Sequence, residues 1–168
     1  IDVSQQAGAA LLVASTGLTQ PTIDALRDFS RRRAVLIAPN TSRGVAVVAK
    51  MAALGAALGP DFDVAIVETH HVAKRDAPSG TALRLARAMR EAGLTVADER
   101  ICALRVGQVI GEHVIRFEGP GESVEIIHRA ASRDLFATGA LEAGGWLAQQ
   151  PAGWYTMEDA LGFASERR

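Results

Sequence analysis

The sequence has only one cysteine, Cys102, which excludes an internal disulfide and suits a reducing cytosol, so we expect a cytoplasmic protein. No apolar run approaches the ~20 residues that a membrane-spanning helix needs, and no membrane partner is predicted. Eighteen basic and 19 acidic residues give a net charge of −1, so the chain has no excess of positive charge that would indicate binding to nucleic acid.

A glycine-rich loop of the G-x-G-x-x-G type is also missing. Such a loop normally holds the pyrophosphate of a dinucleotide where a strand meets a helix. For the chain as written, its absence favours a module that does not hold a cofactor. Metal ligands are scarce too. No further histidine or cysteine lies near His70 and His71 in the sequence to complete a zinc set, so no metal site is predicted.

The first quarter of the chain shows the alternation of strands and helices that is typical of an α/β fold. Hydrophobic residues make up 48% of the sequence and charged residues 22%, as in ordinary globular proteins. Residues 9–14 and 34–38 are apolar runs that predict buried strands, and the pattern of residues 19–33 predicts a helix between them. Strand–helix–strand is the repeating unit of a parallel sheet, so the predicted fold class is α/β. Another helix is expected after residue 42, with Val47, Met51, Leu54 and Leu58 at helical spacing.

From about residue 60 the pattern changes. Residues 62–67 predict a buried strand, and three more strands follow at residues 101–106, 113–117 and 123–130. Together they predict an antiparallel or mixed sheet. A helix between the first two strands should pack on this sheet, because it has an apolar face made of Ala82, Leu85, Ala86 and Met89.

The last 36 residues, 133–168, are predicted to be helical again. Pro151 to Gly153 should break the first helix, and Tyr155 to Gly162 are predicted to form a short last one.

Side chains that could bind a ligand or take part in a reaction are concentrated in one stretch, from Glu68 to Thr81. A helix is predicted to begin at its end, where free N–H groups and the helix dipole favour carboxylates. Lys74 adds a positive charge, and a histidine can transfer a proton near neutral pH. The stretch therefore suggests an anionic small molecule that is held by its carboxylates and protonated during a reaction.

Each group also has a purely structural interpretation. A histidine pair is more often structural than catalytic, a lone lysine is usually a solvated surface residue, and Ser-Gly-Thr is a common helix cap. The conjunction of all three in one stretch favours function.

The residues from Glu68 to Ala82 read Glu-x-His-His-x-x-Lys-x-Asp-Ala-Pro-Ser-Gly-Thr-Ala. This run resembles the signature of the dihydrodipicolinate reductases, now usually called 4-hydroxy-tetrahydrodipicolinate reductases. The resemblance extends over nearly the whole chain through shorter matches, which are Ser15–Thr19, Ala38–Val45, Arg105–Gly107, Gly111–His113 and His128–Arg133. Two positions depart from the family pattern: Ala14 stands where the family has Gly, and Ala46 where it usually has Asn.

The resemblance implies two lobes. One is a partial Rossmann-like nucleotide lobe formed by residues 1–40 and 133–168. The other, residues 41–132, is an α+β lobe with a mixed sheet that binds substrate and meets other copies face to face in a homotetramer. The implied activity is NAD(P)H-dependent reduction of 4-hydroxy-tetrahydrodipicolinate to tetrahydrodipicolinate, in lysine and diaminopimelate biosynthesis.

Site residues follow from the same resemblance. His70 and Lys74 would be catalytic, through proton donation and charge stabilisation. The carboxylates of the substrate would be held by His71, Lys74, Ser79, Gly80 and Thr81. The cofactor, NADH or NADPH, would meet Ala14, Ser15, Thr16, Gly17, Ala38, Pro39, Asn40, Thr41 and Arg133.

Two other functions remain open. The chain could be a non-catalytic oligomerisation module of the same family that does not bind cofactor. It could also be a metal-dependent hydrolase built on His70 and His71.

We expect the chain to represent only part of its parent enzyme. Ile1–Ser4 resembles a strand inside the family's nucleotide domain, so a glycine loop would precede it. Residues 5–14 are too few for the helix and strand that the family has there. Arg100 runs straight into Ile101 where the family has a longer segment. We therefore expect backbone gaps within Ser4–Ala9 and at Arg100–Ile101.

Overall fold

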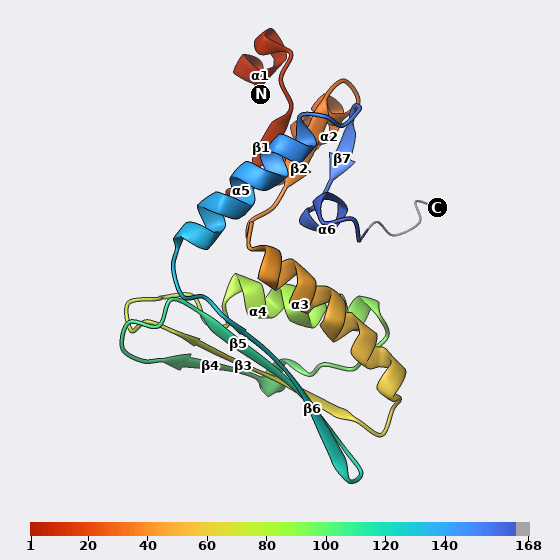
Figure 1. Cartoon of the computed structure of the whole chain (residues 1–168), viewed down its shortest axis with the longest axis vertical. Coiled ribbons are helices and arrows are strands. Elements are labelled where there is room, and N and C mark those ends of the chain that lie inside the picture. Colours follow the sequence, from red (N-terminus) through yellow and green to blue (C-terminus); the bar gives the residue numbers. More distant parts are fainter. Residues whose placement is uncertain (164–168) are drawn as a thin grey trace. The chain divides into compact units, whose positions relative to one another are not determined.

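The computed structural model describes residues 1–163, apart from the side chains of residues 3 and 5 (Figure 1). The chain forms two compact units. Unit 1 combines residues 1–43 with the chain from Asp134 onward, and unit 2 comprises Gly44–Arg133. No helix among the described residues is both long enough and apolar enough to cross a bilayer.

Unit 1 contains a parallel three-stranded sheet with the order β1-β2-β7. The strands are β1 (Leu11–Val13), β2 (Ala34–Ile37) and β7 (Gly153–Tyr155). The helices of the unit are α1 (Asp2–Ala7), α2 (Gln20–Ser30), α5 (Asp134–Leu147) and α6 (Met157–Ala160). The predicted parallel α/β arrangement of the first two strands and the helix between them is confirmed.

Helices α2 and α5 cover opposite faces of this sheet. Leu26 and Phe29 of α2 form a buried cluster with Val35 of β2. On α5, the Trp146 ring packs edge to face on Tyr155, with 5.3 Å between ring centroids. Val35 and Leu36 point to opposite faces, and Tyr155 is the register partner of Leu36. The unit therefore has a helix–sheet–helix layering, which is typical of doubly wound α/β folds.

Unit 2 is an α+β unit with a mixed four-stranded sheet, ordered β4-β3-β5-β6. The strands are β3 (Asp63–His70), β4 (Ile101–Arg105), β5 (Glu112–Gly119) and β6 (Glu122–Arg129). β3 pairs with β4 in parallel and with β5 antiparallel, and β5 pairs antiparallel with β6. The predicted mixed sheet is confirmed.

Two helices cover one face of the sheet of unit 2 (Figure 1). They are α3 (Arg43–Leu54), continued by the 3-10 turn η1 (Gly55–Leu58), and α4 (Gly80–Glu91). A second 3-10 turn, η2 (Asp98–Arg100), precedes β4. The predicted apolar face of α4 is confirmed, because Ala82, Leu85, Ala86 and Met89 are all buried. Gly93 follows α4 with a φ of 96°, a conformation that suits glycine at a helix end.

Several sequence predictions are wrong. Tyr155 lies in β7, where a helix was predicted. On α3, Met51 and Leu54 of the predicted apolar stripe are 47% and 65% exposed, and the buried face is made by Val45, Ala46, Val48, Ala49 and Ala52. The core therefore meets a different face of α3 from the one that the larger apolar residues predicted.

The described backbone passes without interruption through both segments in which gaps were expected. Helix α1 covers Asp2–Ala7, and the Ala9 N–H donates to the Ser4 carbonyl at 2.9 Å. η2 leads directly into β4. The prediction of gaps is wrong, and so is that of a strand at Ile1–Ser4.

Gly139 of α5 provides a test of packing within unit 1. A Cβ at this position would overlap the backbone carbonyl oxygen of Thr41, which cannot move aside as a side-chain tip can. We expect Gly139→Ala to lower the free energy of unfolding by about 1–3 kcal/mol through overpacking. The control is Gly144→Ala on the same helix, where a Cβ meets nothing within 4 Å. That variant should gain up to about 1 kcal/mol from helix propensity. Chemical denaturation compares the two, and equal effects would contradict the packing at Gly139.

Candidate active site

Strand β3 carries two polar side chains into the interior of unit 2. The strand extends to His70, beyond residue 67 where the sequence predicted its end. Because side chains alternate along a strand, Glu68 and His70 point to the same face as Val64 and Ile66, under the helices. Glu68 is fully buried and His70 is 8% exposed. The prediction that these residues belong to a loop is wrong.

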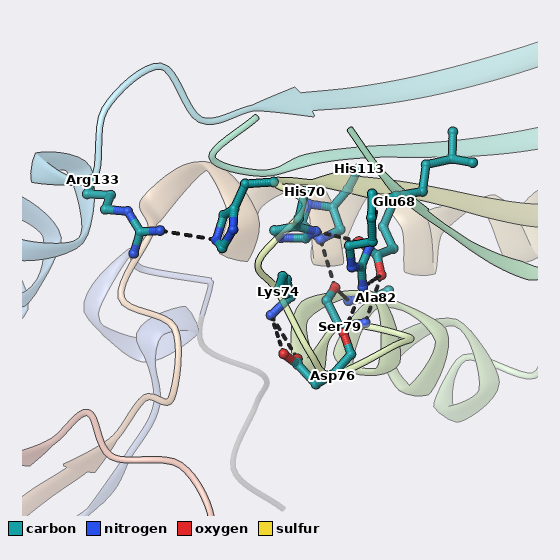
Figure 2. Close-up of polar contacts among 11 residues, drawn as sticks. Glu68, His70, Lys74, Asp76, Ser79, Ala82, His113 and Arg133 are labelled. Atoms are coloured by element: carbon teal, nitrogen blue, oxygen red, sulfur yellow. Dashed lines mark hydrogen bonds and ion pairs between the residues drawn. The ribbon is translucent and has the colours of Figure 1, made fainter. Parts of the chain in front are cut away.

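The Glu68 carboxylate accepts bonds on both of its oxygens (Figure 2). Arg105 donates to it twice, at 2.8 and 3.0 Å, and the Ser79 N–H donates at 3.0 Å. His70 contacts it through Nδ1. Burial raises the pKa of Glu68, but the bonds from Arg105 and His70 outweigh burial and hold its pKa below the usual value. Glu68 is therefore an ionised carboxylate inside the unit.

The His70 imidazole lies among charges of both signs. Burial lowers its pKa, the bond with Glu68 raises it, and the positive charges of Lys74 and Arg105 lower it again. The net pKa of His70 is below the usual value for histidine. A neutral imidazole near physiological pH can exchange a proton with a bound molecule.

The loop after β3 folds back on itself through an ion pair. The Lys74 ammonium donates to both carboxylate oxygens of Asp76, at 2.7 and 2.8 Å (Figure 2). Lys74 lowers the pKa of Asp76 through these bonds. Arg105 also bonds to the Asp76 carbonyl at 2.7 Å, which ties the loop to the buried carboxylate. The ammonium of Lys74 is thus held by a carboxylate of the chain itself.

Helix α4 begins next to Glu68, to which the Ser79 N–H donates. Ser79 is its N-cap, and the Ser79 hydroxyl accepts from the Ala82 N–H at 3.2 Å. Gly80 is exposed, and a Cβ there would meet nothing within 4 Å. Thr81 follows it in the first turn. The start of α4 therefore offers open space next to backbone N–H groups and the positive end of the helix dipole, where a carboxylate is stabilised.

Arg133 and His71 lie together. The Arg133 guanidinium is 3.3 Å from His71 Nε2, and because arginine can only donate, Nε2 is the acceptor (Figure 2). The family resemblance assigned Arg133 to the cofactor and His71 to the substrate. The structure places both in unit 2 and brings them into contact.

His113 on β5 is a further buried residue of the site. Its Nε2 is 3.2 Å from the Ser79 hydroxyl, and its ring centroid is 5.3 Å from that of His70. Burial, followed by the charges of His70 and His128, lowers the pKa of His113 to about 4. His113 is therefore a neutral sheet residue near pH 7, and it links β5 to the start of α4.

Four residues of this arrangement were not among the predicted site residues: Asp76 in the loop, and Glu68, Arg105 and His113 in strands. Glu68 opens the signature run, and Arg105 and His113 both lie in the shorter matches. Each of these three is a charged or polar residue inside a strand pattern, and that signal marks a buried side chain with a partner elsewhere.

The residues predicted for the cofactor lie mostly in unit 1. Ala14–Gly17 directly follow β1 and Ala38–Thr41 directly follow β2. These strands are parallel neighbours, so both segments lie at the same carboxyl edge, where α/β sheets bind ligands. The Ala38 N–H donates to the Val13 carbonyl at 2.9 Å, and residues 14–17 are exposed. The two segments predicted for the cofactor therefore share one edge of the sheet.

Metal coordination has no support in the part of the chain that the structure describes. No group of three histidine, cysteine or carboxylate side chains there is placed to hold an ion. His70 instead bonds to Glu68, and His71 to Arg133.

A family model described as "Dihydrodipicolinate reductase, C-terminus" matches residues 44–161. The chain belongs to the dihydrodipicolinate reductase family. It is 45% identical to the 4-hydroxy-tetrahydrodipicolinate reductase of Myxococcus xanthus over an aligned length of 174 residues. The match covers 93% of this chain and 64% of that protein. The reductase of Aquifex aeolicus is 40% identical over 169 residues, covering 91% and 64%. The chain thus spans slightly less than two thirds of the length of these reductases.

A solved structure of the family has the same fold. It is the dipicolinate-bound dihydrodipicolinate reductase of Paenisporosarcina sp. TG-14, with a TM-score of 0.76 and 24% identity over 92% of this chain and 65% of that one. The reductase of Xanthomonas euvesicatoria is 45% identical to this chain and is covered to 64% of its length. This match is 156 residues long at 93% coverage of this chain, whereas the M. xanthus match needs 174 residues for the same coverage.

The low pKa of His113 makes unit 2 sensitive to acid. Its folded pKa of about 4 lies below the unfolded value of 6.5, so the unfolded chain binds more protons between these pH values. Stability should therefore fall as pH drops from about 6.5 to 4, by on the order of 3 kcal/mol from this residue. NMR titration of the His113 ring should show a neutral imidazole at pH 5.5. A His113 midpoint near 6.5 would contradict the burial described here.

Proposed function

We propose that this chain is the substrate-binding part of a 4-hydroxy-tetrahydrodipicolinate reductase and that it acts in NAD(P)H-dependent reduction in lysine and diaminopimelate biosynthesis. The observation that carries the proposal is the buried Glu68–His70 pair beside the open start of helix α4. This pair lies within the residues that match the family model. It combines a proton donor with a site for carboxylates.

The substrate of this reaction is a cyclic dicarboxylate. One carboxylate would bind at the start of α4, where Gly80 and Thr81 present backbone N–H groups and Ser79 caps the helix. The other would bind between Lys74 and His71. Lys74 is held by Asp76 in the free chain, so a substrate carboxylate has to replace that carboxylate as its partner. Exchange of one carboxylate for another keeps the ammonium paired throughout.

The proton chemistry belongs to unit 2. NADH or NADPH would bind at the carboxyl edge of β1 and β2, with Arg133 as a further proposed contact, and would supply a hydride to the unsaturated ring. The 4-hydroxyl group of the substrate has to leave as water. His70 would deliver the proton that accompanies the hydride, from Nε2 to the resulting unsaturated ring, and Lys74 would stabilise negative charge on the substrate. Water exclusion by the buried surroundings of His70 favours proton transfer to the ligand over exchange with solvent.

The binding step can be tested with dipicolinate as a probe, because a family structure is described as bound to that compound. We expect calorimetric titration to show binding of dipicolinate, with picolinate, which has one carboxylate, binding more weakly. Lys74→Ala should cost about 1.5–3 kcal/mol, or roughly 10–150-fold in Kd, because a charged hydrogen bond is lost. The matched control is Lys50→Ala, the exposed lysine of α3.

Equal Kd values for Lys74→Ala and Lys50→Ala would remove Lys74 from the substrate site. Fluorescence titration with NADH and NADPH then separates two outcomes. Binding of either nucleotide supports the reductase, whereas dipicolinate binding without nucleotide binding supports a module that lacks cofactor.

We further propose that unit 2 forms a homotetramer through the face of its sheet that α3 and α4 leave uncovered. An apolar row crosses all four strands on this face, formed by Cys102, Val67, Val114 and Ile127 in register. Leu104 lies on the same face and is 52% exposed, and Ile127 is 42% exposed. Ion pairs flank the row, with Arg129 and Glu112 on one side and Arg116 and Glu125 on the other. Such an apolar row with a charged rim suits a second copy of the same surface.

A charge inside the apolar row should break this assembly. We expect Ile127→Glu to shift the molecular mass measured by light scattering from a tetramer to a smaller species, because a buried, unpaired carboxylate is costly. Leu54→Glu is the control, since Leu54 is 65% exposed at the end of α3 in the same unit. An unchanged mass for Ile127→Glu would exclude this face as the interface.

A further inference from the structure

We propose that Glu68 is a positioning residue that fixes the orientation and tautomer of His70, so that Nε2 is the atom that exchanges the proton. It does so while anchoring the start of helix α4, and it thereby couples the proton donor to the carboxylate-binding turn. This inference rests on the proposed function for the role of His70, but its geometric content can be tested without turnover.

The bonds around the Glu68 carboxylate determine which ring nitrogen of His70 carries a proton. Arg105 and the Ser79 N–H are donors only, and their short distances fit an ionised carboxylate that accepts every bond. His70 Nδ1 contacts the same carboxylate, so it must donate as well. In the neutral ring the proton is therefore on Nδ1, and Nε2 has the free lone pair.

Space is left around the other nitrogen. A Cβ at Gly111, just before β5, would lie 3.1 Å from His70 Nε2. That separation is tighter than ordinary contact between a carbon and a ring nitrogen, so any larger residue would crowd the atom. Gly111 and Glu68 thus lie at opposite edges of the imidazole. Gly111 leaves space next to Nε2, and Glu68 accepts the bond from Nδ1.

Charge supports the same roles. The charged or titratable groups that face His70 are Glu68 on its own strand, Arg105 on β4, His113 on β5 and Lys74 in the loop. Lys74 and Arg105 both disfavour an imidazolium, and Glu68 is the anion that opposes them. When a protonated His70 gives up the Nε2 proton, the neutral ring keeps Nδ1–H on Glu68. The bond between the two residues is retained, and the ring does not need to turn.

Glu68 also connects His70 to the two segments that would hold the substrate. Its Oε1 accepts from Ser79, the N-cap of α4. Arg105, bound to both of its oxygens, also holds the Asp76 carbonyl in the Lys74 loop. A structural ion pair alone would explain the Arg105 bonds. It would not require the His70 contact or the Ser79 bond on the same carboxylate.

The first test needs no variant. In the chain labelled with ¹⁵N, the neutral His70 ring should give NMR shifts of the Nδ1–H tautomer in the absence of any ligand. His71, whose Nε2 accepts from Arg133, is a reference of the same tautomer. A neutral His70 with the proton on Nε2 would overturn the proposal, whether or not the chain binds dipicolinate or nucleotide.

The second test separates positioning from mere stabilisation. Glu68→Gln keeps the shape and an oxygen for the Ser79 N–H but removes the charge. We expect the His70 titration midpoint to move further down and the single tautomer to be lost, while the dipicolinate Kd stays within about threefold or tightens. Turnover, where cofactor supports it, should fall by roughly 10²–10⁴-fold, the usual range for a lost general acid. The control is Asp98→Asn, an exposed carboxylate paired with Arg90.

If Glu68→Gln alone does not fold, the double variant Glu68→Gln/Arg105→Gln is used instead, because it removes both charges together. An unchanged His70 tautomer and midpoint in either folded variant would overturn the proposal. A loss of dipicolinate binding in parallel with the tautomer would assign Glu68 to general structural support and overturn it as well. Absence of dipicolinate binding in the unmodified chain would count against the proposed function, and the NMR result would still decide the role of Glu68.

Discussion

The structure of unit 2 depends on the burial of one carboxylate. Glu68 has no exposed surface, and an ionised carboxylate away from water costs several kcal/mol unless it is fully bonded. Its partners come from three places: the end of β4, the start of α4 and its own strand. The parallel pairing of β3 and β4 sets His70 opposite Arg105, which brings the guanidinium within reach of Glu68. A change in that register would leave the carboxylate without its cation.

The elements with a strong repeat were predictable from the sequence. Helix α4 and the strands β4, β5 and β6 each have a clear periodicity, and they agree with the structure within a few residues. β7 was missed because only three residues after a proline segment form it, and its pairing partner, β2, lies more than a hundred residues earlier. The exposed Met51 and Leu54 show a different limit, since an apolar stripe does not reveal which side of a helix meets the core.

The sequence predicted many of the residues of the candidate site, but it did not predict which of them bond to one another. The signature run contains His70, Lys74 and Ser79, but local spacing places them in a loop. In the structure, strand alternation puts His70 inside and the loop pairs Lys74 with Asp76. Arg105 lies 37 residues from Glu68, so no local pattern could show that the two would meet. Long-range partners of buried charges depend on sheet pairing, and that pairing is not encoded in any one segment.

Under the proposed function, the charges of the site indicate how binding of the substrate would raise the pKa of the proton donor, His70. In the free chain the two cations Lys74 and Arg105 are matched by the two carboxylates of Asp76 and Glu68. Burial then keeps His70 largely neutral, because the bond and the charge of Glu68 do not fully offset the cost of a buried positive charge. A bound dicarboxylate adds negative charge next to this balanced set, and negative charge favours the protonated imidazole. The pKa of His70 would rise as the substrate binds, so His70 would take up its proton when the substrate that accepts it is in place. Glu68 lets the ring accept that proton at Nε2 without losing its orientation.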